Sequence, residues 1–244
     1  MQAKKQWFEN WFDTKYYHIL YQHRNDDEAH FFMNNLVDYL KIPENSEILD
    51  LACGKGRHSV FLNQKALDIT GLDLSAQSIA HAKQFENKSL HFDVHDMREV
   101  YPKKFDYVFN LFTSFGYFED DAENLKTIQA MKAMLKQRGV LVIDFLNATK
   151  VINNLVLSEK KELNGIYFSI NREVENGFIV KNIQFEDEGE FYHFQERVKA
   201  LNLSDFKVFF EKAGLRLKET FGNFALEAYN KESSDRLIMI LETA

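Results

Sequence analysis

The sequence has a single cysteine, Cys53, and only two prolines in 244 residues. One cysteine excludes an internal disulfide and a zinc site built from several cysteines, and it fits the reducing environment of the cytoplasm. No apolar stretch is long enough to span a bilayer, and Met1–Trp7 runs into acidic and amide residues instead of a signal-peptide core. Repeats and low-complexity tracts are also missing, so no flexible linker between domains is evident. We therefore expect a soluble cytoplasmic protein without a membrane partner.

An excess of basic residues is missing as well. The net charge is −7 at pH 7 and the pI is about 5.7, which argues against a basic groove for nucleic acid. The composition, 45% hydrophobic and 27% charged, is that of an ordinary globular protein. The length suits one large α/β domain, alone or with a small insertion.

Residues 46–146 alternate between strand-like and helix-like patterns. The expected strands are 47–52, 68–73, 89–93, 105–111 and 140–145, and the expected helices are 57–66, 75–86 and 120–136. This alternation predicts a parallel sheet with helices on both faces. A helix that begins at Ser204 and ends at Gly214, followed by strands 215–221 and 236–242, completes the pattern.

The segment after Asn147 breaks this rhythm. Three β-like runs, at 165–174, 177–186 and 190–201, are joined by turn-forming residues and predict a short antiparallel meander. Before residue 46, aromatic residues at helical spacing predict two helices. The expected organisation is an N-terminal helical segment on the cofactor side (1–45), a core (46–147 and 203–244) and an antiparallel β insertion that could roof the substrate (148–202).

The most informative segment is Ile48–His58, which reads ILDLACGKGRH. An apolar run ends at Gly54-Lys55-Gly56, and a helix-like segment follows. The pattern predicts a buried strand, a glycine turn and a helix N-terminus, where backbone N–H groups can approach a ligand closely. By itself the turn indicates a nucleotide of any kind.

Acidic residues stand where the next two strands end. Strand 68–73 ends in Asp73, whose carboxylate can accept hydrogen bonds from both hydroxyls of a ribose. The third strand is followed by Asp96, which can accept from an exocyclic adenine amine, and by Met97, which can pack on the ring. Because ligands of doubly wound sheets bind beyond the carboxyl ends of the strands, these residues predict one nucleoside site.

Three residues near the glycine turn separate the candidate cofactors. Ser59 stands where a dinucleotide fingerprint has its third glycine, which opposes an NAD-type oxidoreductase. Lys55 is not followed by Ser or Thr, as a phosphate-binding loop of the Walker type requires. Asp50 would repel a phosphate but suits a cation. S-adenosylmethionine has a ribose, an adenine and a cationic sulfonium but no phosphate, and it fits these residues best.

Asp50–Gly56, Asp73–Ser75 and Asp96–Met97 resemble the first three motifs of the class I S-adenosylmethionine-dependent methyltransferases. By motif the resemblance covers about residues 46–146, and the C-terminal helix and strands are similar to the family's closing elements. It implies an α/β fold with a Rossmann-like, doubly wound, seven-stranded sheet, mostly parallel with an antiparallel C-terminal strand.

The resemblance also implies roles for single residues. Gly54 and Gly56 would approach the methionine portion of the cofactor. Asp73 would bind the ribose and Asp96 the adenine amine, while residues near Asn110 would line the methyl-donor site. The predicted cofactor-binding residues of the core are therefore Asp50, Ala52, Cys53, Gly54, Gly56, Asp73, Leu74, Asp96, Met97 and Asn110.

Tyr21 and Arg24 in the N-terminal segment complete the predicted set. They could cover the sulfonium and carboxylate of the cofactor, although an ordinary docking helix is the alternative reading of this segment. Cys53 is expected to be a buried thiol and not a nucleophile. No metal site is expected, because the histidines do not have converging ligand spacing.

Candidate groups on the acceptor side are His58, Asn110, Thr113, Ser114 and Tyr117. None of them forms an evident pair of a base and a residue that orients it, so no catalytic base is assigned and the catalytic residues are unknown. In-line displacement from an activated donor needs alignment above all. The segment 111–118 resembles a bacterial subgroup that methylates small molecules, so a small-molecule acceptor is favoured.

Two alternatives remain open at this point. One is a catalytically silent regulatory subunit that binds S-adenosylmethionine or another nucleoside. The other is a methyltransferase that acts on protein or RNA, although the acidic composition argues against a nucleic-acid acceptor. The protein is expected to be a monomer or a homodimer.

Overall fold

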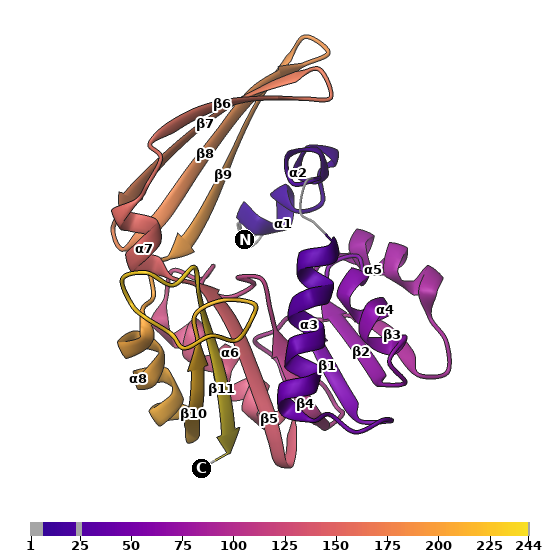
Figure 1. Cartoon of the computed structure of the whole chain (residues 1–244). Coiled ribbons are helices and arrows are strands. Elements are labelled where there is room, and N and C mark those ends of the chain that lie inside the picture. The colour runs from indigo at the N-terminus through magenta and orange to yellow at the C-terminus, as the bar shows by residue number, and fades with distance from the viewer. Residues whose placement is uncertain (1–6, 23–25, 244) are drawn as a thin grey trace.

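The structure, a computed structural model, describes residues 7–22 and 26–243. A seven-stranded sheet with helices on both faces forms the lower part of the molecule in Figure 1, and a four-stranded sheet stands above one end of it. The strands of the large sheet are β1 (Glu47–Leu51), β2 (Asp68–Asp73), β3 (Leu90–Val94), β4 (Phe105–Asn110), β5 (Leu135–Leu146), β10 (Leu215–Phe221) and β11 (Arg236–Thr243).

The large sheet has the strand order β10-β11-β5-β4-β1-β2-β3. Strand β11 is antiparallel to both of its neighbours, and the pairs among β1 to β5 are all parallel. This confirms the predicted doubly wound fold with one antiparallel strand. The chain order reverses between β1 and β4, and ligands of such sheets bind beyond the strand ends at this switch point.

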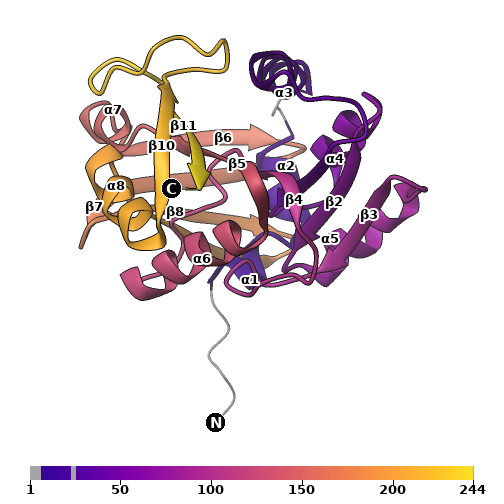
Figure 2. The same cartoon turned by 90° about the horizontal axis from the view of Figure 1, so that it is seen from below.

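Helices cover the large sheet on its two faces (Figure 2). They are α3 (Asp26–Leu40), α4 (Arg57–Asn63) and α5 (Ala76–Ala82) on one face, and α6 (Asp121–Ala133) and α8 (Leu203–Ala213) on the other. Phe32 and Leu62 belong to the hydrophobic cluster on the first face. Met131, Phe206 and Phe210 belong to the cluster on the second. Because both faces are covered, the residues of β1 and β2 are buried in succession, without an alternation of buried and exposed positions. Within the described residues, no helix is both long and apolar enough to cross a membrane.

The segment after α7 (Ala148–Asn153) forms the second sheet. It has four antiparallel strands, β6 (Ser158–Leu163), β7 (Ile166–Glu175), β8 (Phe178–Asp187) and β9 (Glu190–Lys199). The three predicted strands are confirmed, but the sequence did not predict β6. Strand β6 has the sequence SEKKEL and lies at the edge of the sheet. Its residues alternate between exposed and half-buried, and four of the six are charged, so no alternation of apolar and polar residues marks it as a strand.

The described residues before β1 form three helices where two were expected. Helix α1 (Trp7–Trp11) and α2 (Lys15–Leu20) are separated by a break at Thr14, whose side chain accepts a hydrogen bond from the N–H of Tyr17. These two short helices pack on the four-stranded sheet, where Trp11, Tyr16 and Leu20 share a buried cluster with its strands β7 and β8. We refer to α1, α2 and β6–β9 together as the upper unit (Figure 1).

Candidate functional site

The turn after β1 has a left-handed backbone at three positions. Ala52, Gly54 and Gly56 have φ values of 67°, 55° and 78°, a region that glycine occupies without a steric penalty. A Cβ on Gly56 would lie 2.6 Å from the ring of Phe92, so the core packing requires glycine there. A Cβ on Gly54 would meet no atom within 4 Å. The turn therefore borders open space at Gly54, where a ligand can approach the backbone.

Asp73, the last residue of β2, is tied to the glycine turn. Its two carboxylate oxygens accept hydrogen bonds from the N–H groups of Gly54 and Ser75, each at 2.8 Å. Burial raises the pKa of Asp73 above its ordinary value, although these backbone bonds act to lower it. The structure thus brings two members of the predicted set, Asp73 and Gly54, into direct contact.

Asp50 is a buried carboxylate for which the described residues supply no cationic partner. The Ser59 hydroxyl donates to Oδ2 of Asp50 at 2.6 Å. Ser59, which stands where a dinucleotide-binding motif has its third glycine, is therefore a hydrogen-bond donor to this acid. Burial raises the pKa of Asp50 to about 6 against the lowering effect of the Ser59 hydrogen bond, and the Asp73 carboxylate adds to the increase. An unpaired buried carboxylate is costly, so this position favours a cationic ligand.

Asn110 lies at the end of β4, beside β1. Its side chain is fully buried, and Nδ2 donates to the carbonyl of Leu51 at 3.1 Å. Its Oδ1 has no hydrogen-bond partner within residues 7–22 and 26–243. Since nearly all buried polar atoms are paired, this oxygen is a candidate acceptor for a ligand group.

Cys53, also in the turn, is a structural thiol. Burial raises its pKa well above the ordinary value, and the carboxylates of Asp50 and Asp73 add to the shift. A neutral buried thiol is a poor nucleophile. The geometry agrees with the packing role that the sequence suggests.

Asp96, which follows β3, forms an ion pair that sequence reasoning missed. Nη2 of Arg98 lies 2.5 Å from Asp96 Oδ2, and Nη1 of Arg98 lies 2.5 Å from Glu123 Oε1. Burial alone would raise the pKa of Asp96, but the hydrogen bonds and charge of Arg98 outweigh it and hold that pKa below its ordinary value. The carboxylate stays ionised, and an adenine amine would share it with Arg98. An arginine two residues after the acid was the available signal.

Leu74 and Met97 are the apolar side chains of the predicted set. Each follows the end of a strand, β2 for Leu74 and β3 for Met97, and these strands are neighbours in the sheet. Leu74 is 39% exposed, and Met97 is partly buried against the core beneath α6. Both therefore lie at the strand edge that carries Asp73 and Asp96, where an aromatic ring of a ligand could contact them.

Tyr21 lies at the C-terminal end of α2, and its side chain is engaged with the upper unit. Its hydroxyl donates to the carboxylate of Glu196 on β9, at 2.7 and 2.8 Å, and the Lys181 ammonium lies 4.5 Å from its ring centroid. Arg24, the other predicted lid residue, lies outside the described residues. The upper unit meets the core near the site, because the Ser75 hydroxyl donates to the Asp13 carboxylate.

The loop after β4 brings together the candidate acceptor-side residues. The ring of Phe112 lies 4.4 Å from that of His58, which is in the first turn of α4. The hydroxyls of Ser114 and Tyr117 donate to the carbonyls of Leu111 and Thr113, at 2.8 and 2.6 Å. These bonds hold the loop together, and they give no pair of a base and an orienting residue.

A buried ion pair supports this loop and was not predicted. Nε of Arg236 on β11 lies 2.8 Å from Oδ1 of Asp144 on β5, and Asp144 is completely buried. The signal for it was an acid inside the apolar run 140–145. Sequence alone could not pair it with an arginine 92 positions away.

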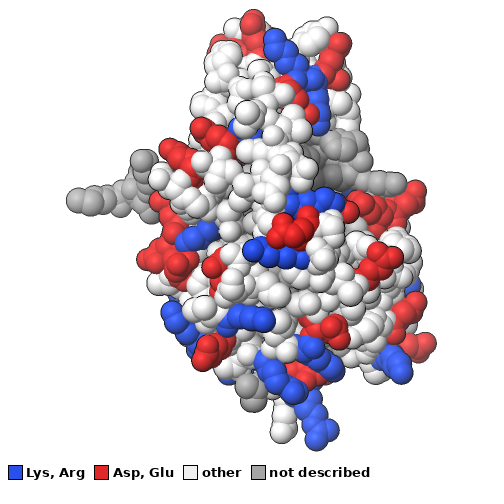
Figure 3. All heavy atoms as spheres, turned by 60° about the vertical axis from the view of Figure 1, so that its left-hand side comes forward, with Lys and Arg blue, Asp and Glu red and all other residues white. Residues whose placement is uncertain are grey.

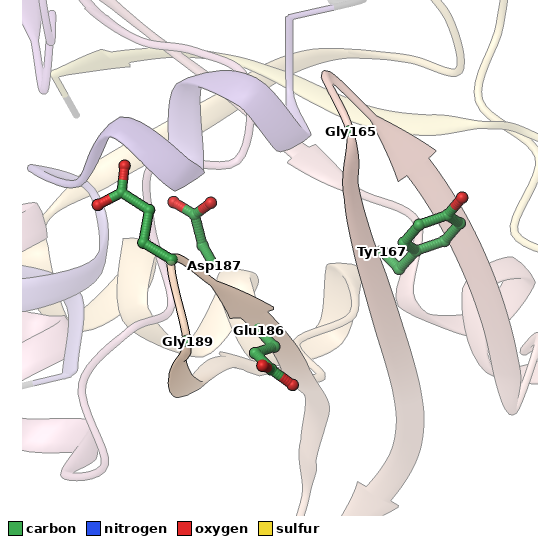
Figure 4. A pocket seen from close by; sticks show the side chains of 6 residues that line it. Gly165, Tyr167, Glu186, Asp187 and Gly189 are labelled. Carbon is green, nitrogen blue, oxygen red and sulfur yellow. The ribbon is translucent and has the colours of Figure 1, made fainter.

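Two pockets lie outside the strand ends. One, of about 450 Å³, is lined by Asp13, Lys15, His18, Lys55, Gln77, Ser78 and His81, between α2, the glycine turn and α5. The other, of about 440 Å³, lies at the tip of the four-stranded sheet and is lined by Gly165, Tyr167 and residues 186–189 (Figure 4). The first adjoins the predicted donor site, and the second is formed by the small sheet alone.

Comparison with known proteins finds one family model and several relatives that match part of the chain. Residues 48–139 match the family model described as a methyltransferase domain. A dTDP-3-amino-3,4,6-trideoxy-alpha-D-glucopyranose N,N-dimethyltransferase of Streptomyces venezuelae is 31% identical over 132 residues, which is 52% of this chain and 54% of that protein. A glycine/sarcosine N-methyltransferase of Aphanothece halophytica is 24% identical over 89% of this chain and 82% of its own length.

The fold is also found among solved structures. The crystal structure of an S-adenosylmethionine-dependent methyltransferase from Clostridium acetobutylicum superposes with a TM-score of 0.78, covering 94% of this chain and 96% of that one at 18% identity. This similarity extends over both sheets. The chain spans about half the length of the relatives that it matches at more than 30% identity.

Proposed function

We propose that this protein is an S-adenosylmethionine-dependent methyltransferase and that it methylates an amine nitrogen of a small polar molecule. Residues 48–139 match a methyltransferase domain. The observation that carries the donor in this proposal is the open glycine turn beside Asp50, a buried carboxylate that has no cationic partner within residues 7–22 and 26–243. A cationic nucleoside without phosphate suits both features.

Named residues would hold the donor. The open space at Gly54 would receive its amino-acid portion, and Asp50 would offset its positive charge. Asp73 would accept hydrogen bonds from the ribose, and Asp96 would accept one from the adenine amine. Leu74 and Met97 would contact the ring, Ala52, Cys53 and Gly56 shape the turn, and Asn110 would offer its unpaired Oδ1. Tyr21 and Arg24 stay as predicted lid residues.

The acceptor would be held by the loop after β4. When bound, S-adenosylmethionine supplies a methyl group that its positive sulfonium already activates, so alignment is the main demand on the protein. Phe112, Thr113 and Tyr117 would align the acceptor and exclude water from it. An amine acceptor has only to lose a proton, which a water or a carboxylate can take, and this suits a loop whose Ser and Tyr hydroxyls bond to backbone carbonyls.

The relatives support a small amine as the acceptor. One is named for an amino sugar and another for glycine and sarcosine, and both names specify methylation of nitrogen. The net charge of −7, and the mixture of acidic and basic side chains on the face in Figure 3, argue against a nucleic-acid acceptor. We further propose that 46–147 and 203–244 form the catalytic core, that the insertion 148–202 roofs the acceptor, and that the N-terminal segment 1–45 covers the cofactor. A cytoplasmic location stays a prediction.

Calorimetric titration tests the donor. S-adenosylmethionine and S-adenosylhomocysteine should both bind, and NAD should not. Asp73→Ala and Asp96→Ala should each weaken binding by about 10- to 100-fold, the effect of losing a hydrogen bond to a charged group. Asp38→Ala, an exposed acid on α3, is the matched control and should bind as wild type does. If neither adenosyl compound binds the wild type, the proposed function is wrong.

Transfer from a donor with a labelled methyl group tests the acceptor. The assay offers glycine, sarcosine, nucleotide-linked amino sugars and a metabolite extract, and mass spectrometry locates the label. We expect the label on the nitrogen of a small molecule. Label found only on protein or RNA would exclude the proposed acceptor class, and donor binding without any transfer would favour the silent regulatory subunit.

A further inference from the structure

The loop after β4 contains two consecutive non-glycine residues in the left-handed region. Phe112 has φ of 57° and Thr113 has φ of 63°. Residues with a Cβ rarely adopt this conformation, and two in succession persist only where the surroundings hold them. Such backbone is found preferentially at functional sites.

The surroundings that hold them are Asp144 and Arg236. The N–H of Phe112 donates to Oδ2 of Asp144 at 2.7 Å, and the N–H of Thr113 donates to the backbone carbonyl of Asp144 at 3.0 Å. Arg236 donates through Nε and Nη2 to the two oxygens of Asp144, at 2.8 and 2.9 Å. The same Nη2 donates to Oγ1 of Thr113 at 2.9 Å. One arginine thus supports the loop directly and also through the acid.

This loop borders the proposed donor site. It begins directly after Asn110, which bonds to Leu51 at the start of the glycine turn, and Phe112 contacts His58 just after that turn. The guanidinium of Arg236 also lies 5.4 Å from the ring centroid of Phe224, whose ring is 5.6 Å from that of Phe112. The ion pair is therefore enclosed, with Asp144 fully buried and the Arg236 side chain 19% exposed.

We propose that Arg236 is a positioning residue for methyl transfer, which through the buried Asp144 fixes the backbone of Phe112 and Thr113 against the acceptor. The proposal rests on the proposed function in one respect, that this loop faces the acceptor. Arg236 itself would contact neither reacting atom. Its effect should appear in the rate of transfer and not in the affinity for the donor.

The test compares Arg236→Met and Arg236→Lys with Arg216→Met, a matched control on the adjacent region of the sheet. Arg216 on β10 also pairs with an acid, Glu242 at 2.9 Å, but it is exposed and lies on a different strand from the pair under test. Hydrogen exchange at the amides of Phe112 and Thr113 should rise at least about 10-fold in Arg236→Met, because both amides are hydrogen-bonded to Asp144 in the wild type. Arg216→Met should leave it unchanged.

Kinetics supply the readout that a purely structural role would not move. With the acceptor from the transfer assay, Arg236→Met should lower kcat by about 100-fold, the effect of a misplaced reacting group, with KM for S-adenosylmethionine within about 3-fold. Arg236→Lys, which keeps the charge and one donor, should recover at least about 10-fold of the loss. If Arg236→Met does not fold, Thr113→Val removes the side-chain bond to Nη2, and hydrogen exchange at the amides of Phe112 and Thr113 should then rise in the same direction.

Unchanged exchange at both amides in Arg236→Met would overturn the proposal, and so would a loss of donor affinity equal to the loss of rate. Failure of the wild type to bind the donor would instead overturn the proposed function. Since the exchange measurement needs neither donor nor acceptor, it decides the contact between Arg236 and the loop in either case.

Discussion

The two sheets of this molecule bury their residues in different ways. In the large sheet, β1 and β2 are covered on both faces, and polar groups appear where these strands end, as at Asp73. In the four-stranded sheet, β7 alternates buried Ile166, Phe168 and Ile170 with exposed or half-buried residues, because α1 and α2 cover only one face. The large sheet is therefore a rigid base that presents polar groups along one edge. The small one holds two short helices by aromatic packing.

This difference suggests that substitutions in the two regions have different effects, on the stability of the upper unit and on donor binding at the large sheet. The cluster around Trp11 is made almost wholly of aromatic and aliphatic side chains and is distinct from the clusters of the core. If the two regions are energetically separate, substitutions inside the upper unit should loosen it while the donor site stays intact. Substitutions at the glycine turn should do the reverse.

Phe168→Ala should have the largest effect. Phe168 is completely buried, with its ring centroid 4.8 Å from that of Phe185, and replacing such a residue by alanine costs about 4 kcal/mol. Urea unfolding followed by tryptophan fluorescence reports this region, because both tryptophans, Trp7 and Trp11, lie in α1. Measured by calorimetry without urea, where the variant is still folded and α2 keeps its place beside the donor site, S-adenosylhomocysteine affinity should stay within about 3-fold of wild type.

The control for this variant is Tyr167→Ala. Tyr167 is the preceding residue on the same strand, and it is 69% exposed on the opposite face. It should unfold at the same urea concentration as wild type. A parallel loss of donor affinity in Phe168→Ala would contradict the separation of the two regions.

Gly54→Ala should have the next largest effect, and it acts on donor binding at the large sheet. Gly54 and Gly177 both have positive φ, 55° and 79°, and a Cβ at either position meets nothing within 4 Å. Each substitution should therefore cost a similar free energy of unfolding, about 1 kcal/mol for a left-handed residue with a Cβ. Only Gly54→Ala should weaken donor binding, by about 100-fold or 2.7 kcal/mol, because its methyl group enters the space that the donor would use.

Urea unfolding of the two alanine variants measures the change in the free energy of unfolding, and calorimetry measures the change in donor affinity. Gly177→Ala, in the hairpin between β7 and β8, is the matched control for backbone strain. Equal donor affinity in the two variants would mean that the open space at Gly54 is not a binding cradle.

The sequence was sufficient for the large sheet because its signals are local. The buried residues of β1, the glycines after it and the acid that ends β2 all lie within 26 residues of one another. They are therefore recognisable from a short stretch of sequence. The expected bounds of strands 68–73 and 215–221 agree with the structure in full. Gly54 and Asp73 come into contact because neighbouring parallel strands end at one edge.

The sequence was insufficient where the decisive contact is distant or lacks a hydrophobic pattern. Arg236 and Asp144 stand 92 positions apart and meet because β11 pairs with β5. The docking of α1 on the small sheet includes a hydrogen bond from Trp11 to Glu196, 185 positions away. Strand β6 has charged residues at four of its six positions, and nothing but its pairing with β7 makes it a strand.

Asp50→Asn should produce the smallest change, and with opposite signs for stability and binding. Because burial raises the pKa of Asp50 to about 6, its ionised form is less stable in the folded protein than in the unfolded chain. The cost is absent below the ordinary pKa, grows as the pH rises from about 4, and is complete above about 6. A shift of about two units corresponds to about 3 kcal/mol, of which asparagine should recover about 2 kcal/mol, since its amide must also be buried.

Urea unfolding between pH 4.5 and 8 measures this difference. Without donor, Asp50→Asn should exceed wild type in stability at pH 8 and approach it as the pH falls toward 4.5, while the exposed Asp38→Asn should show no such trend. With saturating S-adenosylmethionine the order should reverse, because only the carboxylate offsets the positive charge of the donor. A stability difference that does not vary with pH would mean that folding leaves the pKa of Asp50 at its ordinary value. The buried carboxylate would then carry no cost that a cationic donor could offset.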